Sequence, residues 1–187
     1  MGAEVLERPL PKPTAEDYVN ARLLEAMIEA KLALEFLDRG LVRNAAGKAF
    51  QAWRALLAAL LRLELDKLLQ VVRGDEEKKW LMSKAVPRVP TTRMKALSQM
   101  LEEAGYSGIY FATDTALNLH DYQYNGPDPD LALSKFRNRY EAAVAVVKLV
   151  RELLGKVDGL RTRVRWSGEL EAALKALSEE LSRVAIK

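Results

Sequence analysis

Residues 41–72 constrain the fold of this chain more than any other stretch. They contain no proline and consist largely of Ala and Leu, which have the highest intrinsic preference for the α-helix. A helix with one narrow polar stripe packs against neighbours on its other sides. The strongly polar residues here recur mostly at steps of three and four: Asn44, Lys48, Gln51, Arg62, Asp66, Gln70 and Arg73. We therefore predict a single helix over 41–72 at the centre of an all-α bundle, with Trp53, Leu56, Leu57 and Leu60 in the core.

Hydrophobic spacing and helix-end residues predict the helices around this central one. The expected helices cover residues 15–39, 93–104, 108–122, 130–154 and 168–184. Gly40 ends the first helix, so the first two helices form an antiparallel hairpin. Pro129 or Asp130 begins the fifth helix, because proline suits a first helical position, and Ser167 caps the last. The fold class that follows is an up-and-down bundle of about five helices with a C-terminal extension and helix.

Three stretches are expected to lack long helices. The first segment, residues 1–13, carries three prolines and predicts an extended arm. Residues 76–83 fit only a short helical turn, after which Pro87 and Pro90 predict an extended connector. The segment LRTRVRW, residues 160–166, alternates strictly and predicts a strand or extended chain. The chain thus divides into an arm (1–13), a helical bundle (14–155) and a C-terminal extension with one helix (156–187).

Composition excludes several kinds of functional site. The 187 residues include no Cys and one His, so disulfides, zinc–thiolate sites and multi-histidine metal centres within one chain are excluded. We expect no metal and no cofactor. No apolar run approaches the ~20 residues of a membrane span, and residues 1–13 lack the apolar core of a signal peptide. We therefore expect a cytoplasmic protein with no membrane partner. Scarce Asn and Gln suit a thermophile, and the net charge of +3 permits nucleic-acid binding without requiring it.

The order of segments along the chain resembles a known superfamily. A helix hairpin, residues 17–60, is followed by a Leu-rich helix, a helix containing His-x-Tyr and a long closing helix. This order is similar to the HEPN superfamily over roughly residues 14–155. Within the hairpin, residues 43–60 (RNAAGKAFQAWRALLAAL) most resemble the archaeal PaREP proteins, a Pyrobaculum-repeat group of mostly unassigned function. The resemblance implies a helical bundle that forms a homodimer.

His120-Asp121-Tyr122 matches the second half of the HEPN motif, which is Arg, four to six residues, then His, often with Tyr one residue after it. The resemblance implies that in active members the His moves protons around the ribose 2′-hydroxyl of RNA while the Arg stabilises phosphate charge. Here the Arg positions hold Thr113, Asp114 and Thr115. Loss of the cation weakens transition-state stabilisation at phosphate, so the motif predicts a catalytically degenerate module.

Other interpretations of this motif stay open. Lys135, Arg137 or Arg139, after the next turn, could bring a positive charge to His120 and restore a metal-independent ribonuclease. A single His near a helix end is more often structural, held by a carbonyl or favoured by the helix dipole. Tyr122 is either an acceptor modified by a partner nucleotidyltransferase, as the resemblance implies, or an interfacial aromatic residue.

A basic and aromatic cluster lies in the C-terminal extension. Arg161, Arg163 and Arg165 fall on one side of the alternating segment, and Trp166 follows them. Arginines on one face of an extended chain can follow phosphates, and a Trp can stack on a base. The alternative is a solvated edge strand whose charges discourage aggregation.

The sequence is consistent with three functions. The first is a HEPN-like module that binds nucleic acid or a nucleotide and is catalytically degenerate. The second is an active metal-independent endoribonuclease that uses His120 and a displaced Arg. The third is a structural protein whose helices pair with a second copy or another helical chain.

Overall fold

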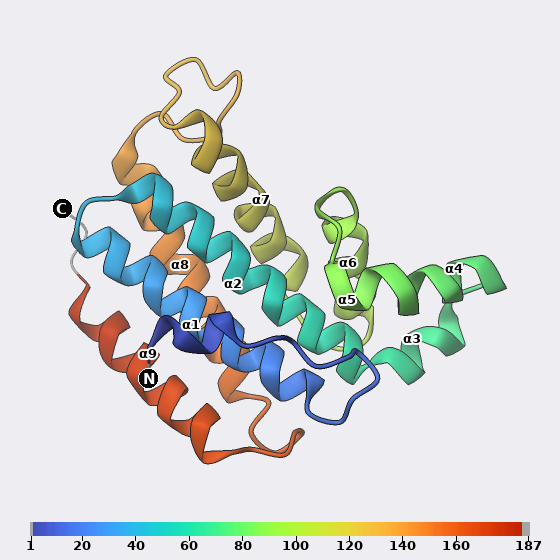
Figure 1. Ribbon diagram of the computed structural model, residues 1–187. Helices are drawn as coiled ribbons and strands as arrows, with labels where there is room; N and C mark the ends of the chain where they lie inside the picture. The colour runs from blue at the N-terminus through green and yellow to red at the C-terminus, as the bar shows by residue number, and fades with distance from the viewer. Residues whose placement is uncertain (1, 185–187) are drawn as a thin grey trace.

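The computed structural model describes residues 2–184, and within them every regular element is helical. The elements are η1 (Ala3–Glu7), α1 (Tyr18–Asp38), α2 (Val42–Leu63), α3 (Leu65–Val71), α4 (Asp75–Trp80), η2 (Leu81–Ala85), α5 (Val86–Arg88), η3 (Thr91–Arg93), α6 (Met94–Glu103), α7 (Ile109–Asn125), α8 (Arg139–Asp158) and α9 (Gly168–Arg183). The predicted all-α helical bundle is confirmed (Figure 1).

Helix α2 lies at the centre of the bundle. It packs against α1, α7 and α8, while α9 packs on α1 and α3–α6 lie toward one end of the molecule (Figure 1). The predicted core residues Trp53, Leu56, Leu57 and Leu60 are all fully buried. The indole N–H of Trp53 donates to the Thr113 hydroxyl of α7 over 2.9 Å, so this polar atom keeps a partner inside the core. Burial of apolar side chains around α2 is therefore the main source of stability.

The predicted single helix over 41–72 is wrong at Glu64, where α2 ends and α3 begins. The Glu64 carboxylate is buried and accepts hydrogen bonds from the Tyr106 hydroxyl, at 2.7 Å, and from Arg163. Lys67 forms a 2.7 Å ion pair with the same carboxylate. Tyr106 and Arg163 come from distant parts of the chain and help to hold Glu64 between the two helices, which no helix propensity indicates.

The extended connector predicted at Pro87 is also wrong, because the chain stays helical up to Arg88. A π-helical turn, η2, leads into α5, and Pro87 occupies one of its first two positions. Proline is tolerated there because it lacks only an N–H that has no partner in the first turn. Val89 then ends the helix in a left-handed conformation.

Helix α8 begins at Arg139, about ten residues later than predicted. The carboxylate of Asp128 accepts backbone N–H groups from Asp130, Leu133 and Ser134, which stabilises a loop where the helix was expected. Asn138 then caps α8 by accepting the N–H of Glu141 over 2.9 Å. A local side-chain hydrogen-bond network of this kind competes directly with a helix.

Two further expectations near the ends of the chain are corrected. The segment 160–166 forms turns and irregular chain, and no strand occurs among residues 2–184. The arm contains the short helix η1 before it continues without regular structure along α1. Ser167 caps α9 as predicted, accepting the N–H of Leu170. In the described part of the chain no helix is both long and apolar enough to cross a membrane.

Candidate functional site

His120 lies on α7 where that helix packs against α2. Its ring stacks on Phe50 of α2, with centroids 4.1 Å apart and planes 28° apart. Tyr124, one turn further along α7, meets the imidazole edge-on at 5.2 Å. The Nδ1 atom is buried and has no hydrogen-bond partner among the described residues. Helical spacing therefore builds an aromatic group from two elements that are far apart in sequence.

Arg54 adds a cation to this group. It lies one turn after Phe50 on α2, and its guanidinium carbon is 5.8 Å from the Phe50 ring centroid, within the range of a cation–π contact. The side chain is half-buried, and burial lowers the pKa of its guanidinium, which Glu25 and Glu29 partly oppose and Arg22 reinforces. Among residues 2–184 no carboxylate lies within ion-pair distance of Arg54. An arginine in this position is suited to an anionic ligand.

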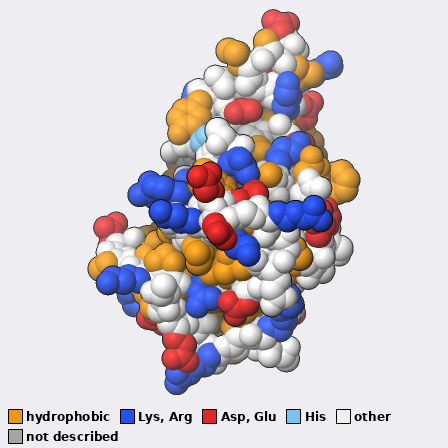
Figure 2. Space-filling model, turned by 90° about the vertical axis from the view of Figure 1, so that its right-hand side faces the viewer, with side chains coloured by type: hydrophobic (Ala, Val, Ile, Leu, Met, Phe, Trp, Pro, Cys, Tyr) orange, Lys and Arg blue, Asp and Glu red, His pale blue; other side chains and the backbone are white. Residues whose placement is uncertain are grey.

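The electrostatics keep His120 neutral. Burial lowers the pKa of the imidazole below its usual 6.5, Asp121 opposes this effect, and Arg54 lowers the pKa further. Near pH 7 the ring is therefore uncharged, with one nitrogen available to accept a proton. Figure 2 shows this single histidine, in pale blue, partly visible at the surface beside a hydrophobic side chain.

Lys135, Arg137 and Arg139 take other positions. Arg139 donates to the carbonyl of Gly40 over 3.1 Å, at the turn between α1 and α2. The backbone N–H of Arg137 donates to Glu141, and both Arg137 and Lys135 are solvent-accessible residues of the loop before α8. The charged groups that influence His120 are Asp121 and Arg54 instead. The best candidate for the displaced Arg is therefore Arg54, which precedes His120 in the chain, and not a residue of the segment that follows it.

Tyr122 is part of the core. It is 1% exposed and packs edge-on against Phe136, with ring centroids 5.7 Å apart. Burial raises the pKa of its hydroxyl. Tyr124, by contrast, is 64% exposed. The structure therefore offers Tyr124, and not Tyr122, as the aromatic side chain that a ligand or a modifying enzyme reaches first.

The basic cluster of the C-terminal extension is largely occupied by internal contacts. Arg161 pairs with Asp158 at 2.7 Å and with Glu171 at 3.0 Å. The indole N–H of Trp166 donates to Glu171 over 2.8 Å. Arg163 pairs with the buried Glu64, and Arg165 is exposed at the surface. Because 160–166 is not a strand, these arginines do not form one continuous basic stripe.

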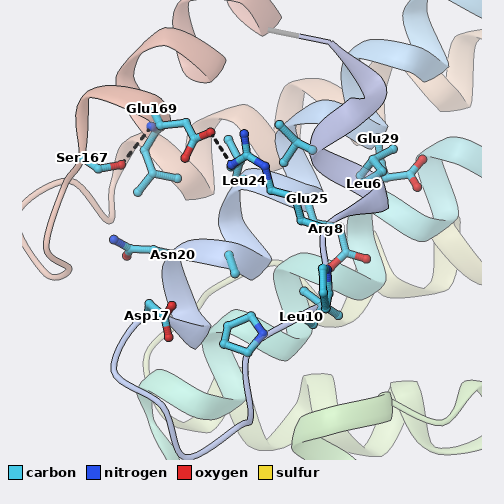
Figure 3. A pocket seen from close by; sticks show the side chains of 15 residues that line it. Leu6, Arg8, Leu10, Asp17, Asn20, Leu24, Glu25, Glu29, Ser167 and Glu169 are labelled. Carbon is cyan, nitrogen blue, oxygen red and sulfur yellow. Dashed lines mark hydrogen bonds and ion pairs between the residues drawn. The ribbon is translucent and has the colours of Figure 1, made fainter.

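A cavity of about 580 Å³ lies between the arm, α1 and the start of α9. Figure 3 shows Leu6 and Leu10 of the arm beside Leu24 of α1, with acidic side chains around them. The carboxylates that line it belong to Asp17, Glu25, Glu29 and Glu169. Arg8 is paired with Glu169 over 2.8 Å, so this cavity is unsuited to phosphate. No group of three or more potential metal ligands occurs in the described part of the chain.

Comparison with known proteins gives one match. The model of the archaeal PaREP1/PaREP8 family matches residues 21–147, which include most of α1, all of α2–α7 and the start of α8. Neither the curated proteins nor the solved structures contain a match. The matched region contains Phe50, Arg54, His120 and Tyr124.

Proposed function

This chain belongs to the archaeal PaREP1/PaREP8 family, and we propose that it is a HEPN-like helical module that binds nucleic acid or a nucleotide without cutting it. The binding surface is the exposed ring of Tyr124 and the partly exposed His120, which stacks on the buried Phe50, together with Arg54. Single-stranded nucleic acids are commonly bound by aromatic rings that stack on bases and by cations that contact phosphates.

The half-buried guanidinium of Arg54 carries this proposal. Removing a cation from water is unfavourable unless an anion compensates it, and none of the described carboxylates does so within ion-pair distance. A phosphate group supplies the missing charge and accepts two parallel N–H groups from one guanidinium. The exposed ring of Tyr124 is 5.2 Å from His120 and gives a base a surface on which to stack.

Binding is tested with a fluorescently labelled single-stranded RNA and anisotropy measurements. Arg54→Met keeps the aliphatic stem and removes the charge, and we expect about tenfold weaker binding, the loss of one good phosphate contact. The slope of log affinity against log salt should also fall by about one. Arg151→Met on α8, an exposed arginine whose side chain has no partner among the described residues, is the matched control. Equal affinity of wild type and Arg54→Met contradicts the proposal.

Ribonuclease activity is the second candidate, and the lowered pKa of the partly exposed His120, to which Arg54 contributes, favours it. A neutral imidazole can accept the proton of a ribose 2′-hydroxyl, and Arg54 would stabilise the charge that develops on phosphate. In this version Arg54 replaces the Arg that is missing at positions 113–115.

Cleavage separates the two candidates. The same RNA is incubated with wild type and His120→Ala in the presence of a chelator, and the products are separated by gel electrophoresis. Cutting by wild type that is lost in His120→Ala supports the ribonuclease. Binding without cutting supports the first proposal, and equal cutting by both proteins rules out a catalytic role for His120.

A further inference from the structure

A further cavity, about 390 Å³, is lined in part by Arg54. The arm, α1, α2 and the segment around α5 enclose it. Three guanidinium groups line the cavity, from Arg22, Arg54 and Arg88, and its one carboxylate is Glu25. Its remaining walls are Leu10, Ala58, Pro87 and Val89. Cations are therefore in clear excess among the charged groups that line this cavity.

The only carboxylate of the cavity is already paired. Arg22 forms a 2.7 Å ion pair with Glu25 and donates to the Tyr18 hydroxyl and the Pro87 carbonyl. This leaves Arg54 and Arg88, neither of which has an ion pair or side-chain hydrogen bond within the part of the chain that the structure describes. The cavity thus presents two guanidinium groups that have no ion-pair partner among the described residues.

The backbone beside Arg88 is strained. Val89 is buried and has φ 43° and ψ 71°, a left-handed conformation that is unusual for a β-branched residue. The π-helical turn Leu81–Ala85 precedes it by one short helix. Both features are unfavourable for stability and are typical of functional sites. Here they place Arg88 at the cavity and direct the Pro87 carbonyl to Arg22.

We propose that this cavity binds a terminal phosphate, that is, a phosphate monoester on a nucleotide or at the end of an RNA chain. The inference rests on the proposed function and names the part of the ligand that the protein recognises. A phosphate monoester carries close to two negative charges near pH 7, which matches the two unpaired arginines. A phosphodiester inside a chain carries one. Arg54 belongs to both sites, so the attached ribose and base extend toward His120 and Tyr124.

The arm forms one wall of the phosphate cavity. Leu10 and Glu25 line this cavity and also the acidic one, and Figure 3 shows both side chains from the acidic side. The arm thus contributes an apolar side chain beside the arginines, and Leu10 itself remains partly exposed to solvent.

The experiment compares one RNA sequence with a phosphate at its 5′ end, at its 3′ end or at neither. We expect wild type to bind one phosphorylated form about tenfold more tightly than the unphosphorylated form. Arg88→Met should remove this preference, and Arg88→Lys should restore part of it, because lysine keeps the charge without the two-pronged geometry. Arg151→Met again serves as the control. Arg88 is exposed, and thermal melting checks that each variant is folded.

Isothermal titration with adenosine monophosphate and with inorganic phosphate distinguishes the sources of the group. If the mononucleotide binds in a manner that depends on Arg88 and no RNA binds, the phosphate site is supported and its ligand is a free nucleotide. Equal affinity of wild type for all three RNAs overturns the terminal-phosphate inference but leaves RNA binding intact. Absence of binding to every one of these probes overturns both proposals.

Discussion

Glu64 is the single residue that most affects the path of the chain. Its carboxylate is buried at the bend between α2 and α3 and contacts Lys67, Tyr106 and Arg163. Burial alone raises the pKa of a carboxyl group, but hydrogen bonds from these three residues lower the pKa of Glu64 from 4.5 to about 2. The carboxylate is thus more favourable in the folded protein than in the unfolded chain.

The depressed pKa of Glu64 makes stability depend on pH. The contribution is complete above pH 4.5, the unfolded pKa, and is lost as pH falls toward the folded value of about 2. We expect Glu64→Gln to reduce the free energy of unfolding at neutral pH by on the order of 3 kcal/mol. The difference from wild type should shrink in acid. Chemical denaturation at several pH values measures it, and Glu179→Gln, at an exposed site on α9, is the control. A difference independent of pH contradicts this account.

The pKa of His120 reports on the burial of its imidazole and on the charges of Arg54 and Asp121 near it. Because the chain has one His, its imidazole signals in a proton NMR titration need no assignment. We expect a pKa below 6.5 that rises in Arg54→Met, which removes a nearby positive charge, and falls further in Asp121→Asn. An unchanged pKa in Arg54→Met would show that Arg54 does not act on the imidazole.

At the scale of elements, the contact between α2 and α7 brings the candidate residues together. Gly47 on α2 faces Gln123 on α7, and a Cβ at position 47 would lie 2.6 Å from the side-chain amide carbon. Gly is therefore retained inside a helix, where it is less favourable than Ala by about 1 kcal/mol. This close approach supports the packing of α7 that places His120 over Phe50.

A double-mutant cycle tests that contact. We expect Gly47→Ala to stabilise the protein by about 1 kcal/mol when Gln123 is first replaced by Ala, because helix propensity then acts alone. In the wild-type background the same change should lose this gain, since the Gln123 side chain must move. Chemical denaturation of the four proteins gives the coupling energy, and a value of zero would mean that the two side chains do not meet.

At the scale of the molecule, α2 is covered by its own chain and supplies no apolar surface for a second copy. The exposed apolar side chains lie elsewhere. Phe111 on α7 is 74% exposed beside a groove of about 420 Å³ between α7 and α8. Leu133 and Tyr140, in and after the loop that connects these helices, are also exposed. An exposed apolar side chain beside a groove is typical of an interface, and we propose that the surface around Phe111 forms the homodimer.

Sedimentation velocity tests the homodimer. We expect wild type to sediment as a dimer and Phe111→Ser to sediment as a monomer or to dissociate at higher concentration, because the substitution removes a large exposed apolar group. Val71→Ser, which changes an exposed apolar residue of α3, should leave the dimer intact. A wild-type monomer at all accessible concentrations would refute the homodimer.

The sequence by itself determined the features that depend on neighbouring residues. Ala and Leu over 41–63 specify a buried helix, and the apolar spacing predicts that Trp53 and Leu57 are in the core. Ser167 identifies the start of α9. Each of these signals acts within a turn or two of helix, so it can be read from adjacent positions.

Only the tertiary structure decided the bend at Glu64 and the composition of the candidate site. Arg163 lies 99 residues from Glu64 in the chain, and no local pattern indicates that contact. The sequence offered cations at 135–139 for His120, whereas the arginine whose charge lowers the pKa of His120 is Arg54, on a helix that packs against α7. The sequence shows that Phe50 and Arg54 lie one turn apart on the same helix, but it does not show that His120 of α7 packs against Phe50. Contacts between distant residues arise when helices pack, and that packing is a property of the whole chain.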